Sequence, residues 1–116
     1  MTPISTATGT PGPAITIGTP AKDTAEVIAI TPDGKTAYVS SYNDGTVIPV
    51  STATSTAGKP IKVGKNPCFI AITPDGKTAY VSNSGSGTVT PISTTTNTPG
   101  TPILVGSDPG PIAITP

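Results

Sequence analysis

The sequence predicts an all-β fold made of repeated four-stranded antiparallel sheets, and three observations lead to this prediction. Thr, Pro, Gly and Ser supply 61 of the 116 residues, and the β-branched Thr, Ile and Val supply 44, which is typical of strands and turns. The 28 Pro and Gly residues leave no stretch for an amphipathic helix without a helix breaker inside it. Apolar residues also recur at a fixed spacing, which distinguishes the chain from disordered Pro- and Gly-rich sequences.

A repeat of 42 residues organises the chain. Residues 28–40 recur without a change at residues 70–82. The segment Ile48–Thr52 recurs in similar form as Thr90–Thr94, and Thr2–Thr6 is a third copy of it near the N-terminus. The repeat predicts a partial unit over residues 1–27, full units over residues 28–69 and 70–111, and the first strand of a further unit at residues 112–116.

Each full unit contains four short strands separated by turn-forming residues. In the second full unit we expect these strands at Phe69–Thr73, Thr78–Ser82, Thr88–Thr94 and Pro102–Gly106. The turn Pro74–Lys77 joins the first two strands, because proline presets φ, aspartate bonds the backbone ahead of it and glycine accepts a positive φ. A Thr-rich connector at residues 95–101 leads to the fourth strand. Four sequential strands in a unit of this length match a β-propeller blade, which has about 40 to 45 residues.

The predicted strands amount to about two and three-quarter blades, whereas a closed propeller has about four to eight. The first and last blades would then expose apolar faces that normally pack against neighbouring blades. We therefore expect an incomplete ring, unless copies of the chain form a homo-oligomer or the remaining blades belong to a longer chain.

Two prolines conflict with a regular sheet. Pro49 and Pro91 lie inside the third strand, which is an inner strand of a four-stranded blade and needs its N–H groups for pairing. We expect either a bulge at these positions or an N–H position that faces no partner.

The segments Thr73–Asn83 and Gly87–Ile92 resemble the repeat of the YVTN-family β-propellers, which is named for its Tyr-Val-Thr-Asn sequence. This chain has Ser82 at the third of those positions, and the other copy has Ser40 and Ser41 at the third and fourth. The resemblance covers essentially the whole chain and implies a surface-layer or secreted protein with a scaffold or binding role. Some similar propellers are lactonases or dehydrogenases, so the fold by itself does not imply a function.

The two ends of the predicted blades differ in how closely the internal copies agree. The turns at residues 32–35 and 74–77 are identical, whereas the loops after the second strand read Ser-Tyr-Asn-Asp at residues 41–44 and Asn-Ser-Gly-Ser at residues 83–86. Because loops on a fixed scaffold commonly carry binding residues, we expect the ligand-binding face at the variable end. Its candidate residues are Lys22, Asp23, Glu26, Tyr42, Asn43, Asp44, Lys65, Asn66, Phe69 and Asp108.

We expect no catalytic residue, no metal site and no cofactor. Asp33 and Asp75 lie in identical turns, which explains both carboxylates without acid–base chemistry. The chain contains no His to activate Cys68, and it lacks the His and Cys residues that a zinc site needs. Tyr38 and Tyr80 occupy matching strand positions and are expected to pack against neighbouring blades.

Charge and composition limit the expected partners and location. The net charge is zero and there is no basic stripe, so we expect neither nucleic acid nor membrane insertion. A single Cys among many Thr and Ser suits an extracellular or cell-surface protein. We expect a non-enzymatic β-propeller scaffold that binds a protein or a glycan through its variable loops. The alternatives are a fragment of a propeller enzyme of the lactonase or dehydrogenase type, and a purely architectural surface-layer element.

Overall fold

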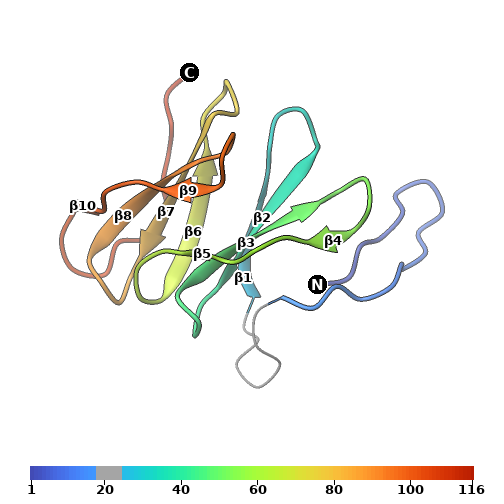
Figure 1. Ribbon diagram of the computed structural model, residues 1–116, viewed down its shortest axis with the longest axis horizontal. Coiled ribbons are helices and arrows are strands. Elements are labelled where there is room, and N and C mark those ends of the chain that lie inside the picture. The colour runs from blue at the N-terminus through green and yellow to red at the C-terminus, as the bar shows by residue number, and fades with distance from the viewer. Residues whose placement is uncertain (18–24) are drawn as a thin grey trace.

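The computed structural model describes residues 1–17 and 25–116, which form two antiparallel sheets and an N-terminal segment (Figure 1). The first sheet contains β1 (Ala25–Ile30), β2 (Thr36–Ser41), β3 (Thr46–Ser51), β4 (Thr56–Ala57) and β5 (Ile61–Lys62). The second repeats this order with β6 (Pro67–Ile72), β7 (Thr78–Asn83), β8 (Thr88–Ser93), β9 (Thr98–Pro99) and β10 (Ile103–Leu104). Each sheet is one four-stranded unit whose outermost strand is divided into two short pieces. The predicted all-β fold of propeller-type sheets in an incomplete ring is confirmed.

The two sheets lie side by side, splayed apart toward one end, and the N-terminal segment lies beside the first sheet (Figure 1). In this segment Ile4 forms an antiparallel bridge with Pro11. The amide of Ile15 donates to the Met1 carbonyl at 2.7 Å, and the Met1 amino group donates to the Ile15 carbonyl at 3.0 Å. The segment therefore pairs as the outer two strands of a blade do. Residues 112–116, where the sequence predicts the first strand of a further unit, form no strand.

The prolines of β3 and β8 face the outer edge of each sheet. β2 and β3 keep a regular register through the Tyr38–Pro49 pair, so the expected bulge in this strand is absent. The carbonyl of Pro49 accepts a hydrogen bond from Gly58 N, and that of Pro91 accepts one from Gly100 N, both at 2.7 Å. Because the nitrogen and carbonyl of a strand residue point to the same side, the missing N–H faces the break in the outermost strand. The alternative expectation, an N–H position without a partner, is the one that holds.

The outermost strand differs from its predicted position. β9 already pairs with β8 at Thr98–Pro99, inside the predicted connector, and β10 covers only Ile103–Leu104. The register against β8 shifts between β9 and β10, at the point where Pro91 offers no hydrogen-bond donor. The break in the edge strand thus lies opposite the proline of the neighbouring strand.

Neighbouring residues of one strand belong to different hydrophobic cores. One core lies between the N-terminal segment and the first sheet and contains Ile15, Ile17, Ala37, Val39, Ile48 and Val50. The other lies between the two sheets and contains Tyr38, Val47, Ile61, Ala79, Val81 and Ile92. Tyr38 is 1% exposed, as expected of a packing residue, and its hydroxyl donates to Asn97 Oδ1 at 2.6 Å. β2 and β3 of the first sheet are therefore buried on both faces.

A buried amide connects β7 to β8. Asn83 is fully buried, and its Nδ2 donates to the hydroxyl of Thr90 at 2.9 Å and to that of Thr88 at 3.2 Å. Gly64 lies so close that a Cβ at this position would come within 2.7 Å of Asn83 Cβ. The amide is held between the glycine on one side and the two hydroxyls on the other.

The first sheet has a different pair of residues at the same positions. Ser41 stands where the second sheet has Asn83, and Ile48 stands where it has Thr90. The buried hydroxyl is thus absent where the amide that needs it is absent. Ser41 donates instead to Asp44 Oδ2 at 3.0 Å, and Thr46 Oγ1 has no hydrogen-bond partner among the described residues.

We expect Thr90→Ile to lower the free energy of unfolding by about 1–3 kcal/mol, because it removes a partner of a buried amide. The double variant Thr90→Ile/Asn83→Ser reproduces the pair of the first sheet and should regain most of that loss. Urea unfolding followed by circular dichroism measures both, and the exposed Thr95→Ile serves as a control that changes stability by less than about 0.5 kcal/mol. A double variant no more stable than Thr90→Ile alone would contradict this account.

Candidate functional site

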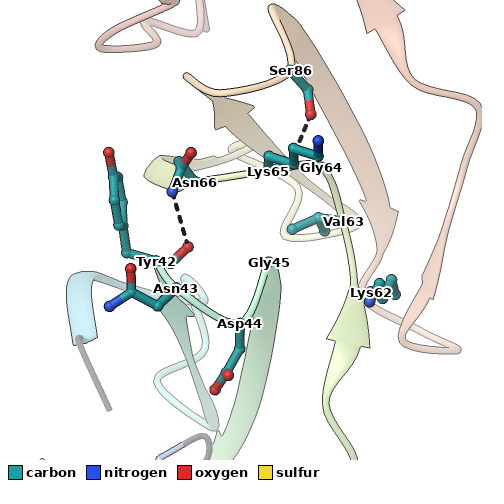
Figure 2. Close-up of a pocket in the computed structure, with 10 residues that line it drawn as sticks. All are labelled: Tyr42, Asn43, Asp44, Gly45, Lys62, Val63, Gly64, Lys65, Asn66 and Ser86. Atoms are coloured by element: carbon teal, nitrogen blue, oxygen red, sulfur yellow. Dashed lines mark hydrogen bonds between the residues drawn. The ribbon is translucent and has the colours of Figure 1, made fainter. Parts of the chain in front are cut away.

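A cavity of about 510 Å³ opens at the end of the sheets where the loops differ between the copies. It is lined by Tyr42–Gly45 from the β2–β3 loop, by residues 62–66 from the end of β5 and the following loop, and by Ser86 from the β7–β8 loop. Figure 2 shows the first stretch on one side of the hollow and the second on the other. Both sheets therefore contribute to the cavity.

Hydrogen bonds of the main chain fix the walls of this cavity. Val63 N donates to the carbonyl of Gly45 at 3.0 Å, which holds the two stretches of the first sheet together. Lys65 N donates to Ser86 Oγ at 2.7 Å, which joins them to the second sheet (Figure 2). Asn66 has a φ of 54°, in the left-handed region that Asn tolerates better than most residues. The outline of the cavity is thus determined largely by the backbone.

The side chains around the cavity offer an aromatic ring, hydrogen-bonding groups and both signs of charge. Asn66 Nδ2 donates to the carbonyl of Tyr42 at 3.5 Å, which directs the amide toward the β2–β3 loop (Figure 2). Tyr42 and Asp44 are half-buried, whereas Lys62 and Lys65 are exposed. Such a set can hold a polar ligand through hydrogen bonds and provide apolar contact through the ring.

The repeat builds the same hollow a second time with different side chains. A cavity of about 640 Å³ is lined by the counterpart positions of the second unit, namely Ser84, Gly85, Ser86, Gly87, Leu104, Gly106, Ser107 and Asp108. Small residues stand there in place of the tyrosine, asparagine and aspartate of the first β2–β3 loop. Two equivalent hollows therefore share one scaffold, and large polar side chains gather in the first.

The structure brings together five of the ten candidate residues, Tyr42, Asn43, Asp44, Lys65 and Asn66, which all line the first cavity. Asp108 lines the second cavity. Phe69 lies on β6, 37% exposed, and lines neither of them. Lys22 and Asp23 lie outside the described residues, and so does the side chain of Glu26 in β1.

Lys62 also lines the first cavity and is absent from the predicted set. It lies at the end of β5, whereas the prediction compares the loops between strands. A signal for it exists in the sequence, because its counterpart in the second unit is Leu104. Comparison of the strand ends between the two copies would have found this lysine.

A cavity of about 410 Å³ at the opposite end includes Asp33 and Asp75. Asp33 accepts hydrogen bonds from Thr31 Oγ1 at 2.6 Å and from Lys35 N at 3.0 Å. The hydroxyl first, and then the backbone N–H, hold the pKa of Asp33 below its usual value. The pKa of Asp75 is lowered by the equivalent groups of its own turn. Both carboxylates are engaged in turn formation, so this end is the weaker candidate for a site.

Cys68 is half-buried, and its thiol lies 3.6 Å from the Ser82 carbonyl and 3.5 Å from the Pro109 carbonyl. Among residues 1–17 and 25–116, no three His, Cys, Asp or Glu side chains come together in a way that could hold a metal ion. In the part of the chain that the structure describes, no helix is long and apolar enough to cross a membrane.

Comparison with solved structures identifies the fold. The chain is similar to hydrazine synthase of Kuenenia stuttgartiensis, with a TM-score of 0.74 and 31% identity over 77% of this chain and 25% of that chain. It is similar to a protein of unknown function from Desulfotomaculum acetoxidans, with a TM-score of 0.79 and 24% identity over 98% of this chain and 38% of that chain. A candidate 6-phosphogluconolactonase from Bacteroides fragilis has a TM-score of 0.76 and 20% identity, over 95% of this chain and 34% of that chain.

These solved structures are propeller-like, which agrees with the two sheets of this chain. The chain spans between 25% and 38% of the length of the three matched chains. No family model matches the sequence, and no curated protein matches it.

We expect Thr73→Val to raise the pKa of Asp75 toward its ordinary value, because the hydroxyl is the main cause of its lowered pKa. Asp33 keeps its own threonine and serves as the control within the same molecule. Titration of the side-chain carboxyl resonances by NMR measures both. Equal pKa values of Asp75 with and without the hydroxyl would contradict the assignment.

The lowered pKa values also set the direction of a pH effect. A carboxyl whose pKa is lower in the folded than in the unfolded state stabilises the fold at pH values above its unfolded-state pKa, which is near 3.8. This contribution is lost as the pH falls through the folded-state pKa. Acid unfolding should therefore begin at a higher pH when both Thr31 and Thr73 are replaced by Val.

Proposed function

We propose that this chain is part of a non-enzymatic β-propeller of the YVTN-repeat type, and that it binds a glycan through the cavity lined by Tyr42, Asp44, Lys62, Lys65 and Asn66. The observation that supports this proposal is the difference between the two equivalent hollows. The strands beneath them are nearly identical in sequence, so the scaffold alone does not require the larger polar side chains of the first hollow.

The chemistry of the first hollow suits a sugar. Sugar hydroxyls both donate and accept hydrogen bonds, and the carboxylate of Asp44 and the amide of Asn66 complement both functions. The ring of Tyr42 can contact the apolar face of a sugar. Lys62 and Lys65 favour a sugar that carries a carboxylate or sulfate group, because both are exposed, positively charged residues that line the cavity.

Binding can be tested on a panel of immobilised neutral and uronic-acid-containing polysaccharides, followed by calorimetry with oligosaccharides of the type that binds. Tyr42→Ser and Lys65→Ser introduce the residues of the second hollow at the same positions, so they remove ligand contacts with little effect on the fold. We expect each to weaken binding about tenfold, which is the usual effect of losing an aromatic or charged contact.

The matched control is Ser107→Ala in the second hollow, which should leave the affinity unchanged. Binding of an acidic polysaccharide by all variants alike would contradict the choice of cavity. Binding to none of the polysaccharides would exclude a glycan and favour a protein ligand for the same face.

The second candidate function is that of a fragment of a propeller enzyme, which is favoured by the similarity to a candidate 6-phosphogluconolactonase. At 20% identity, that similarity supports a shared fold but not a shared activity. The chain has no His and no Arg, so two common catalytic groups for a phosphorylated substrate are absent from it. We expect no hydrolysis of 6-phosphogluconolactone above the uncatalysed rate, measured by proton release in a pH-stat.

We also propose a location at the cell surface or outside the cell. The support is compositional, because a single cysteine and an abundance of Thr and Ser suit an oxidising environment. Accessibility of the protein to an impermeant amine-reactive label on intact cells tests this, with a cytoplasmic protein as the control.

A further inference from the structure

Half of the lysines of this chain lie close together in the sequence, at the outer edge of the first sheet. Lys59, Lys62 and Lys65 are all exposed, and we call them the basic edge. Lys62 lies in β5, which pairs with β3, and the other two flank this strand. Residues 45–74 contain no acidic side chain. The basic edge is therefore a local positive patch on a chain whose net charge is zero.

Backbone hydrogen bonds fix the course of the chain along the basic edge. The bonds of Val63 N and Lys65 N that shape the cavity also hold the chain after Lys62. Gly58 N donates to the Pro49 carbonyl at 2.7 Å, which fixes the chain just before the first lysine. The lysines follow one another at every third residue, so that neighbouring Cα atoms of the set are at most about 10 Å apart.

The corresponding edge of the second sheet has none of these charges. Thr101, Leu104 and Ser107 occupy the matching positions, and residues 87–116 contain no lysine. Lysines on an edge strand can prevent its pairing with another strand. That role does not account for the basic edge, because the second sheet has equally short edge strands and lacks the lysines. The three charges distinguish the first unit, as do the large polar side chains of its cavity.

We propose that the basic edge binds an anionic polysaccharide, which runs out of the cavity and along β5 to Lys59. This inference rests on the proposed function, because it takes the acidic sugar held in the cavity to be one unit of a longer chain. Lys62 and Lys65 line the cavity, whereas Lys59 does not. The charged path therefore begins in the cavity and continues beyond it, where carboxylate or sulfate groups of the polymer meet the next ammonium group.

The exposure of the three lysines favours a polymer over a small anion. A single ion pair between exposed groups contributes little to binding and is screened by salt. Several such contacts with one polymer reinforce each other, because binding at one lysine holds the next anionic group near the next lysine. Among the described residues that line the cavity, Asp44 is the one acid, so Lys62 and Lys65 keep the charge of this wall positive.

The length of the ligand separates this inference from binding in the cavity alone. The probes are digalacturonate, decagalacturonate and the methyl ester of decagalacturonate, measured by calorimetry at low and at physiological ionic strength. We expect decagalacturonate to bind at least about tenfold more tightly than digalacturonate, with a steeper dependence on salt. The methyl ester has the same backbone without the charges and should lose this advantage. A matching series of sulfated galactan oligomers decides between carboxylate and sulfate as the preferred group.

Lys59→Thr introduces the residue of the second unit at an exposed position outside the cavity. We expect it to weaken the binding of decagalacturonate about threefold and to leave the binding of digalacturonate unchanged. Lys35→Thr is the matched control, because it removes the same charge from an exposed turn between β1 and β2 and should change neither affinity. Circular dichroism verifies that both variants are folded.

Equal affinity of the unaltered chain for the short and the long acidic oligomer overturns this inference and leaves an acidic sugar in the cavity. Equal losses in Lys59→Thr and Lys35→Thr also overturn it, since net charge then explains the effect. Single-stranded DNA bound as tightly as decagalacturonate overturns the assignment to a polysaccharide. If no acidic oligomer binds, the inference is wrong, and the polysaccharide panel shows separately whether the cavity still binds a neutral glycan.

Discussion

Packing of one sheet face on the next is the constraint on which the rest of this structure depends. A strand of the first sheet sends alternate residues into two different cores, as Tyr38 and Val39 do, so neither face of the sheet is free to be polar. The sequence of β2 is consequently restricted at nearly every position, because five of its six residues are buried. The buried Asn83 amide group is accommodated by the hydroxyl of Thr90, to which its Nδ2 donates.

The loops are free of this constraint, and they carry the differences between the copies. Two backbone hydrogen bonds, from Val63 N to the Gly45 carbonyl and from Gly85 N to the Lys65 carbonyl, keep the hollow in shape whatever side chains surround it. One scaffold can therefore hold Tyr42, Asn43 and Asp44 in the first hollow and Ser84, Gly85 and Ser86 in the second. Separation of a fixed frame from exchangeable loops is what makes repeat proteins suited to recognition.

The sequence predicts the strands and turns well, because an exact internal copy must fold in the same way twice. It does not predict where the outermost strand breaks, because Thr is frequent throughout the segment that contains β9 and β10. The position of the break depends on the side of β8 toward which Pro91 offers no N–H donor. For the cavity, comparison of the loops finds Tyr42 and its neighbours, but it misses Lys62 at the end of a strand. The same comparison also selects Phe69, because this aromatic residue does not recur in the other copy. Phe69 nevertheless lines neither cavity, so a difference between the copies does not by itself place a residue in the site.

The divided outermost strand limits how far another β-strand can pair with this edge of each sheet. A chain so rich in Thr, Ile and Val, with no net charge, has the composition of a cross-β former. Growth of such a fibril requires a continuous row of free N–H and C=O groups along a sheet edge. β4, β5, β9 and β10 each offer only two residues, and Pro99 removes one more donor. The outer edge of each sheet is therefore a poor template for another strand. Pro49 and Pro91, which lie opposite the break in the edge strand, contribute to this property.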